Sequence, residues 1–101
     1  MGNVHLIHSP SQSTLEMLKS RMPKRTRDIL EKDGNPRIGA VALMQGKVID
    51  MFAAADLADK VAPVLVSELH GSCPQHINSI AIFGDSEAVS SAVKAIEARF
   101  S

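Results

Sequence analysis

The order of apolar runs and periodic segments after residue 37 is the feature that most limits the folds open to this chain. Three apolar runs predict strands, and they lie at Ile38 to Met44, Val64 to Leu69 and Ile77 to Phe83. Two segments predict helices: Lys47 to Ala62, which Pro63 closes, and the segment after Gly84, where Asp85 is a good N-cap. The predicted order is therefore strand, helix, strand, hairpin loop, strand, helix. An α+β fold, with a small antiparallel sheet and two helices on one of its faces, accommodates this order most simply.

The segment before residue 37 supplies the further strand that such a sheet needs. The segment Val4-His5-Leu6-Ile7-His8 is typical of a short strand, and Ser9-Pro10 ends it. We expect one domain in all. Residues 1–36 would form a variable polar segment around that strand, and residues 37–101 would form the main core.

Residues 13 to 22 allow two interpretations. Leu15, Leu18 and Met22 recur at helical spacing, which favours a helix. Ser13, with Glu16 three residues on, would then form its capping box. A short edge strand is the alternative.

The charge balance and the short apolar runs exclude several classes of function. Lysine plus arginine and aspartate plus glutamate each number 11, so the net charge is zero at pH 7. This balance argues against a protein that binds nucleic acid or a membrane surface through bulk charge. No apolar stretch approaches the ~20 residues of a membrane-spanning helix, and no signal peptide is visible at the N-terminus. With a single cysteine the chain has no internal disulfide, so we expect a cytosolic protein.

No catalytic motif stands out in the sequence. The basic run from Lys19 to Arg27 is followed by acidic residues and has no aromatic neighbour for base stacking, so we interpret it as a solvated surface. Asp56 and Asp59 are helix neighbours, but the sequence does not indicate the pocket that a general acid–base pair requires. Phosphate-binding loops and nucleophile elbows are lacking. We therefore expect that the chain is not an enzyme.

Several short motifs, taken in order, resemble the bacterial microcompartment (BMC) shell domain. They are Gly39 in a strand, Ala54-Ala55-Asp56, Lys60, Val64, the Gly71-Ser72 loop, and the run Gly84-Asp85-Ser86-Glu87-Ala88-Val89 that opens the last helix. The match covers roughly residues 37 to 100. Each motif is weak alone, and their order and spacing together are fairly specific.

The resemblance is to the circularly permuted form of this domain. In the common form the last strand follows the second helix, whereas here Val4 to His8 matches that strand. The run Gly-Ser-Cys-Pro-Gln-His at residues 71–76 is most similar to the GrpU group of shell proteins from glycyl-radical-enzyme microcompartments.

The resemblance implies a structural shell subunit in the bacterial cytoplasm. Such subunits form homohexamers that tile with other shell proteins, with a narrow pore on the six-fold axis. By position, Gly71, Ser72 and Cys73 would line the pore, with Pro74 beside them, and Lys60 would contact neighbouring hexamers. The permuted families also place extra N-terminal chain near the pore mouth.

Cys73 is the residue with the most chemistry to offer, and its role is open. It lies in the pattern His70-x-x-Cys73-x-x-His76. The residues themselves allow an inert thiol in a turn, or a zinc-like site shared with histidine, although three candidate ligands are too few for a closed tetrahedral site. The resemblance implies a third role, in which thiolates from several subunits hold an iron–sulfur cluster at the pore. His70 and His76 would then hydrogen-bond to that site or titrate in the pore, or they are simply exposed loop ends.

Two functions from other classes are the alternatives to a shell subunit. One is a free-standing iron–sulfur electron carrier. The other is a small ferredoxin-like regulatory module that binds a metabolite as a dimer. Native mass separates them, because only the shell subunit is expected to be a hexamer.

Overall fold

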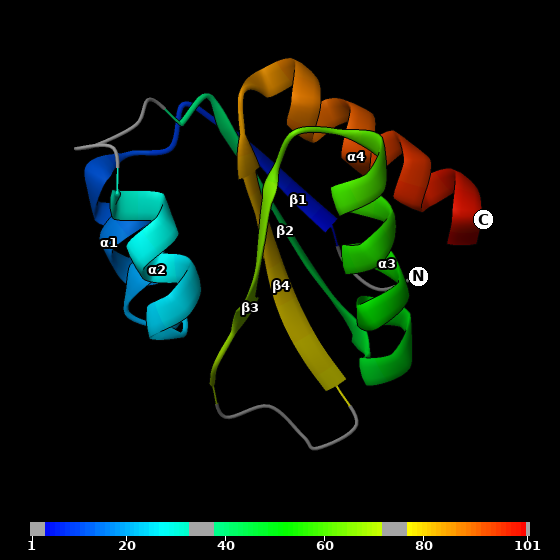
Figure 1. Cartoon of the computed structure of the whole chain (residues 1–101), viewed down its shortest axis with the longest axis horizontal. Coiled ribbons are helices and arrows are strands. Elements are labelled where there is room, and N and C mark those ends of the chain that lie inside the picture. The colour runs from blue at the N-terminus through cyan, green and yellow to red at the C-terminus, as the bar shows by residue number, and fades with distance from the viewer. Residues whose placement is uncertain (1–3, 33–37, 72–76, 101) are drawn as a thin grey trace.

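A computed structural model describes residues 4–32, 38–71 and 77–100. Its elements, in chain order, are β1 (Val4–His8), α1 (Gln12–Lys19), α2 (Lys24–Glu31), β2 (Ala40–Lys47), α3 (Val48–Val61), β3 (Leu65–Leu69), β4 (Ile77–Gly84) and α4 (Ser86–Phe100). The strands form one antiparallel sheet in the order β1-β2-β4-β3. Helices α3 and α4 lie on one side of this sheet, and α1 and α2 lie on the other (Figure 1). The predicted α+β class and the two helices on one face are confirmed.

The strand predicted at Val4–His8 is present and takes the edge position beside β2. Val4 lies opposite Met44 and His8 lies opposite Ala40, so the pairing runs the whole length of β1. Directly after the strand, Ser9 adopts a positive φ of 47° and its amide donates to the Gly39 carbonyl at 2.8 Å. The N-terminal strand β1 thus supplies the fourth strand of the sheet, as predicted.

Two local predictions differ from the structure, and one open alternative is excluded. Strand β2 was expected to end at Met44, but it continues through Gln45 and Gly46 because these residues pair with Ser79 and Asn78 of β4. Residues 12–19 are helical, which excludes the edge strand, and the N-cap is Ser11 rather than Ser13. The Ser11 hydroxyl accepts a hydrogen bond from the Thr14 amide at 3.2 Å, the geometry of a side-chain cap.

The last helix begins as predicted. The Asp85 carboxylate accepts a hydrogen bond from the Ala88 amide at 2.9 Å, which satisfies one of the free amides of the first turn. Glu87 lies in that turn, where a negative charge complements the helix dipole.

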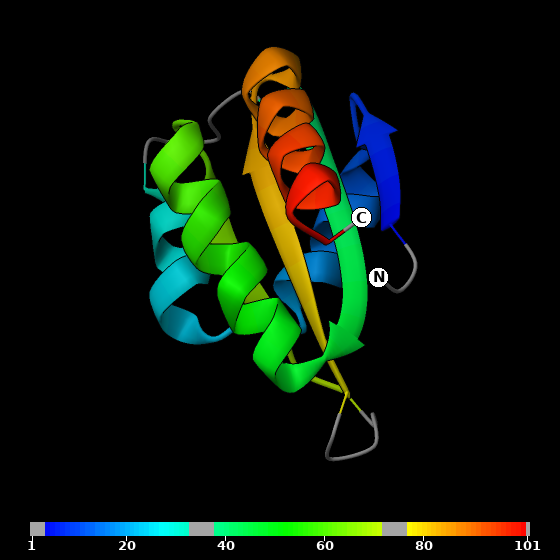
Figure 2. The same ribbon diagram turned by 90° about the vertical axis from the view of Figure 1, so that its right-hand side faces the viewer.

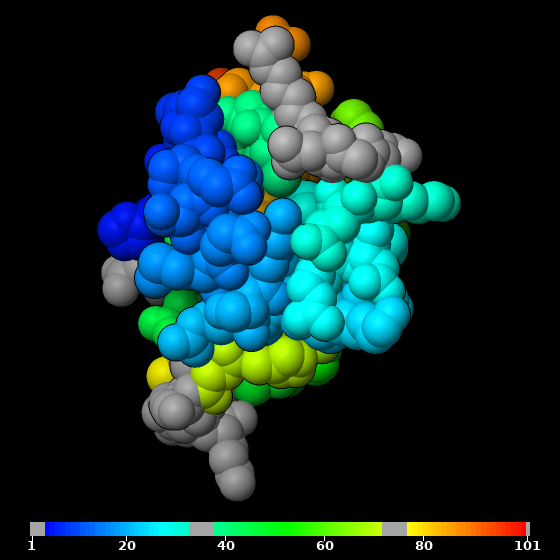
Figure 3. Space-filling view, turned by 90° about the vertical axis from the view of Figure 1, so that its left-hand side faces the viewer, coloured from blue at the N-terminus to red at the C-terminus, as the bar shows by residue number. Residues whose placement is uncertain are grey.

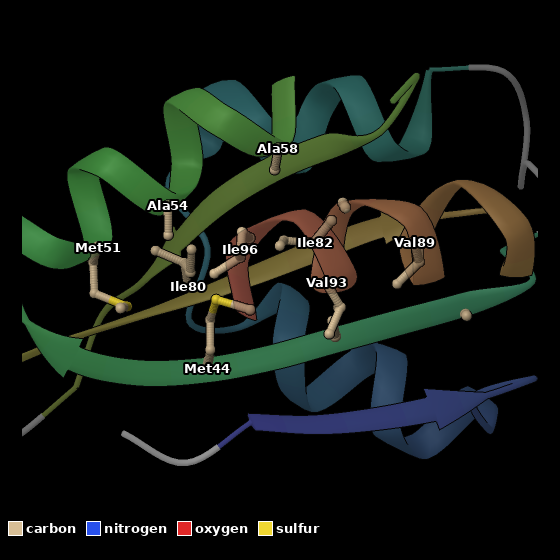
Figure 4. Packing of buried hydrophobic residues seen from close by; sticks show 12 residues of the cluster. Met44, Met51, Ala54, Ala58, Ile80, Ile82, Val89, Val93 and Ile96 are labelled. Atoms are coloured by element: carbon tan, nitrogen blue, oxygen red, sulfur yellow. The ribbon is translucent and has the colours of Figure 1, made fainter. Parts of the chain in front are cut away.

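Small side chains fill the interface between the sheet and helices α3 and α4. Figure 4 shows the buried cluster, and its members are Ala40, Ala42, Met44, Met51, Ala54, Ala58, Ile80, Ile82, Val89, Ala92, Val93 and Ile96. Alanines from both helices face the strands, and side chains of this size let helix and sheet approach closely. Helices α3 and α4 lie next to each other, with α3 on the side of the sheet away from β1 (Figure 2).

The opposite face of the sheet carries a second buried cluster, which the sequence did not lead us to expect. Leu18, Met22 and Leu30 from the α1–α2 segment pack on Val41, Ala81 and Phe83 of the strands. Figure 3 shows α1 and α2 side by side over this face, with the end of β3 still visible below them. Both faces of the sheet are therefore covered, and the N-terminal segment belongs to the folded core.

Candidate functional site

The connection between β3 and β4 is the candidate pore loop, and the structure describes its base. Leu69 pairs with Ser79, so the two strands are in register up to the point where the connection leaves the sheet. His70 and Gly71 follow β3 and are exposed. The other predicted pore residues, Ser72, Cys73, Pro74 and His76, lie outside the described residues, so their predicted roles stay predictions.

Arg21, between α1 and α2, binds the base of this loop through two hydrogen bonds. The His70 amide donates to the Arg21 carbonyl at 2.7 Å, and the Arg21 guanidinium donates through Nη1 to the His70 carbonyl at 3.1 Å. The N-terminal segment therefore holds the point where β3 passes into the candidate pore loop. This agrees with the expectation that extra N-terminal chain lies near that loop.

Gly71 lies directly against the same guanidinium. A Cβ added at Gly71 would be 2.7 Å from Arg21 Nη1, which is closer than non-bonded atoms approach. The absence of a side chain at Gly71 thus leaves room for the arginine to reach the His70 carbonyl. Arg21 was not among the predicted site residues because its partner is 49 positions away in the sequence.

Lys60, the predicted contact between hexamers, lies in the last turn of α3 and is exposed. Its ammonium is 2.7 Å from the Asp56 carboxylate, one helical turn earlier. The hydrogen bond to Asp56, with the charge of that carboxylate, raises the pKa of Lys60 above its ordinary value of 10.5. Asp56 is therefore the partner of a surface lysine. Asp59, the helix neighbour of Asp56, is also exposed.

A shallow hollow of about 300 Å³ lies on the α1–α2 face, at the end of the sheet from which the candidate pore loop leaves. Its polar lining comes from His5, Gln45 and Ser79, and the Gln45 amide donates to the Ser79 hydroxyl at 3.2 Å. The rest of the lining is apolar: Leu43, Met44, Leu69 and Ile80. Among the described residues that line it there is no carboxylate, thiol or amine, so the His5 imidazole has no charged partner in the lining, and the hollow offers mainly hydrogen bonds and apolar contact.

The described residues form neither a metal site nor a membrane-spanning helix. Across residues 4–32, 38–71 and 77–100, no three His, Cys, Asp or Glu side chains come together as a metal site. A cluster held through Cys73 would thus have to take its other ligands from outside these ranges or from other subunits. In the same ranges, no helix has the length and apolar character to cross a bilayer.

The fold matches solved structures of microcompartment shell proteins. No protein-family model matches the sequence, and no curated protein matches it. The ligand-free GrpU microcompartment shell protein from Pectobacterium wasabiae is 38% identical, with a TM-score of 0.74 over 94% of this chain and 99% of that one. The chain belongs to the microcompartment shell proteins.

Two further shell proteins share the fold. The GrpU shell protein from Clostridiales bacterium 1_7_47FAA is 27% identical, with a TM-score of 0.69 over 98% of this chain and 95% of that one. The fused permuted hexameric shell protein MSM0275 from the RMM microcompartment is 15% identical, with a TM-score of 0.70 over 98% of this chain and 45% of its own length. The resemblance to the permuted shell-protein family is thereby confirmed. The permutation corresponds to β1 at the sheet edge.

Proposed function

We propose that this shell protein is a structural subunit of a bacterial microcompartment in the bacterial cytoplasm, where it forms homohexamers that tile with other shell proteins. The observation that carries the proposal is the match to GrpU from Pectobacterium wasabiae, at 38% identity over nearly the full length of both chains. The proposed role is mechanical rather than enzymatic. The connection between β3 and β4 would line a pore on the six-fold axis.

Exposed apolar side chains on two opposite sides of the molecule support a ring of copies. On α3, Ile49 is 74% exposed and Phe52 is 67% exposed, and on β1 Leu6 is 37% exposed. Helix α3 lies on the side of the sheet away from β1 (Figure 2). A closed ring is built from head-to-tail contacts between two different surfaces of each subunit, and apolar residues on opposite sides suit such contacts.

Lys60 is the proposed contact between neighbouring hexamers. Its side chain is 70% exposed at the end of α3, so it is available to another molecule. Electron microscopy of concentrated protein tests this role. Lys60→Asp should leave hexamers intact and abolish extended sheets, while Lys94→Asp, the same change on α4, should leave the sheets unaltered. Sheets of ordinary extent from Lys60→Asp would refute the assignment.

The proposed cofactor is an iron–sulfur cluster bound by Cys73 thiolates of several subunits. A hexamer brings six copies of a single cysteine around one axis, and clusters are commonly held by four thiolates. A cluster without six-fold symmetry would use only some of the six. When bound, the group would supply electron transfer at the pore or would block the pore.

A further inference from the structure

Arg21 stands out at the base of the candidate pore loop because no carboxylate of the described residues is paired with it. The salt bridges of the described chain join Lys19 to Glu16 and Glu31, Lys24 to Asp28, Arg25 to Glu68, and Lys60 to Asp56. Within the described residues, the Arg21 guanidinium takes part in one hydrogen bond, to the uncharged His70 carbonyl, and in no salt bridge. It therefore presents a net positive charge.

The position of this charge is fixed by its contacts. Two hydrogen bonds join Arg21 to His70, and one of them is between backbone atoms, so the residue is held even when its side chain moves. The contact with Gly71 places Nη1 at the first residues of the connection between β3 and β4. A guanidinium has five N–H donors, and the bond to His70 uses one. The remaining donors are on an exposed side chain and available to a ligand.

The charged groups nearby do not cancel this charge. Glu68 is the acidic residue of β3, and its carboxylate lies 3.4 Å from Arg25. Lys19, two residues before Arg21, is paired with Glu16 and Glu31 at 3.5 Å each. His70 itself is exposed beside Arg21.

We infer that Arg21 binds small oxyanions, carboxylate or phosphate, at the entrance of the pore and favours their passage over that of cations. The inference rests on the proposed function, which brings the β3–β4 connections of six subunits to one axis. Six copies of Arg21 would then form a ring of positive charge, and rings of arginine or lysine line pores that are selective for anions and phosphate. The planar fork of the guanidinium also matches the two oxygens of a carboxylate or phosphate.

Three variants separate the charge of Arg21 from its structural contact. Arg21→Gln removes the charge and keeps an N–H donor for the His70 carbonyl. Arg21→Lys keeps the charge. Arg99→Gln removes the same charge from the far end of α4, where Arg99 lies over the Phe100 ring.

The hexameric protein is titrated with inorganic phosphate, and separately with acetate, at constant ionic strength. The NMR chemical shifts of the His70 and Gly71 amides report binding. Wild type, Arg21→Lys and Arg99→Gln should show saturable shifts with at least one anion. Arg21→Gln should weaken that binding about fivefold or more, because a charge-assisted bond is lost. Equal binding by Arg21→Gln and wild type, or no shift in wild type with either anion, would overturn the inference. Neither result would contradict the proposed hexamer. A protein that is not a hexamer would contradict the proposed function and this inference together.

Discussion

The hydroxyl oxygens of Thr26 and Ser67 lie 2.6 Å apart in the interior, where α2 meets the edge strand β3. Thr26 is 1% exposed and Ser67 is 2% exposed, so neither hydroxyl has access to bulk water. The Ser67 hydroxyl also donates to the Glu68 carbonyl at 2.9 Å, and Thr26 lies 3.3 Å from the Pro23 carbonyl. This pair is a buried polar link between the N-terminal segment and the rest of the sheet.

Removal of one partner should destabilise the fold. We expect Ser67→Ala to lower the free energy of unfolding by about 1–2 kcal/mol, because the Thr26 hydroxyl is left buried with a poorer partner. The double variant Thr26→Val with Ser67→Ala should cost less than the two single changes added together. Urea unfolding at one fixed protein concentration measures this, with exposed Ser91→Ala on α4 as the control. Strictly additive costs would show that the two hydroxyls are not coupled.

Gly39 lies against the backbone at the start of α4 and should not tolerate a side chain. An added Cβ would be 3.0 Å from the Ser86 amide nitrogen and 3.1 Å from the Asp85 Cα, and neither backbone atom can move without shifting the helix. We expect Gly39→Ala to cost about 1–3 kcal/mol of stability, as for overpacking. The matched control is Gly71→Ala, whose Cβ would meet the end of the flexible Arg21 side chain. Thermal unfolding compares the two, and an equal loss of stability would contradict the explanation for Gly39.

The fold is predictable from the sequence where local pattern and tertiary role agree. The segment Val4–His8 predicted a strand and the cap at Asp85 predicted a helix start, and the structure confirms both. Helix α2 was not predicted because its buried face consists of Thr26 and Leu30 within a strongly charged segment, which leaves little apolar periodicity. A signal for the second covered face was nevertheless present. The run from residue 40 to 44 is apolar at every position, whereas a strand with one face in water alternates.

The candidate site was predictable only in part. Lys60 could be proposed as a contact between hexamers from its place among the motifs that resemble the shell domain. The structure adds its salt bridge to Asp56. The contact between Arg21 and His70 joins residues 49 positions apart, and no local pattern encodes such a contact. It depends on how the α1–α2 segment packs on the sheet.

The pKa of Lys60 should depend on Asp56. Because the pair raises this pKa in the folded chain, its small stabilising effect is present below the ordinary value of 10.5 and is lost as the pH rises through the raised pKa. We expect Asp56→Asn to lower the Lys60 pKa towards its ordinary value. Asp59→Asn, which removes the same charge from the same helix, should change it much less. NMR titration of the Lys60 side chain gives both values, and an unchanged pKa in Asp56→Asn would mean that the salt bridge does not persist in solution.

Cys73→Ser should abolish iron binding without loss of the fold. Cys73 is the single cysteine of the chain, so no other thiolate can replace it. Anaerobic reconstitution followed by iron and sulfide analysis measures the effect, and the circular dichroism spectrum of the variant serves as the folding control. Iron retained at the wild-type ratio would assign the metal to other ligands. A wild-type hexamer that takes up no iron would contradict the proposed iron–sulfur cluster.

The native mass of the purified protein tests the shell-subunit account most directly. Six chains of 10.8 kDa give about 65 kDa, and native mass spectrometry resolves this value from that of a monomer or a dimer. The account predicts a dominant hexamer at low protein concentration, with larger assemblies as the concentration rises. A monomer or dimer as the largest species would contradict it and would favour a free electron carrier or a metabolite-binding module.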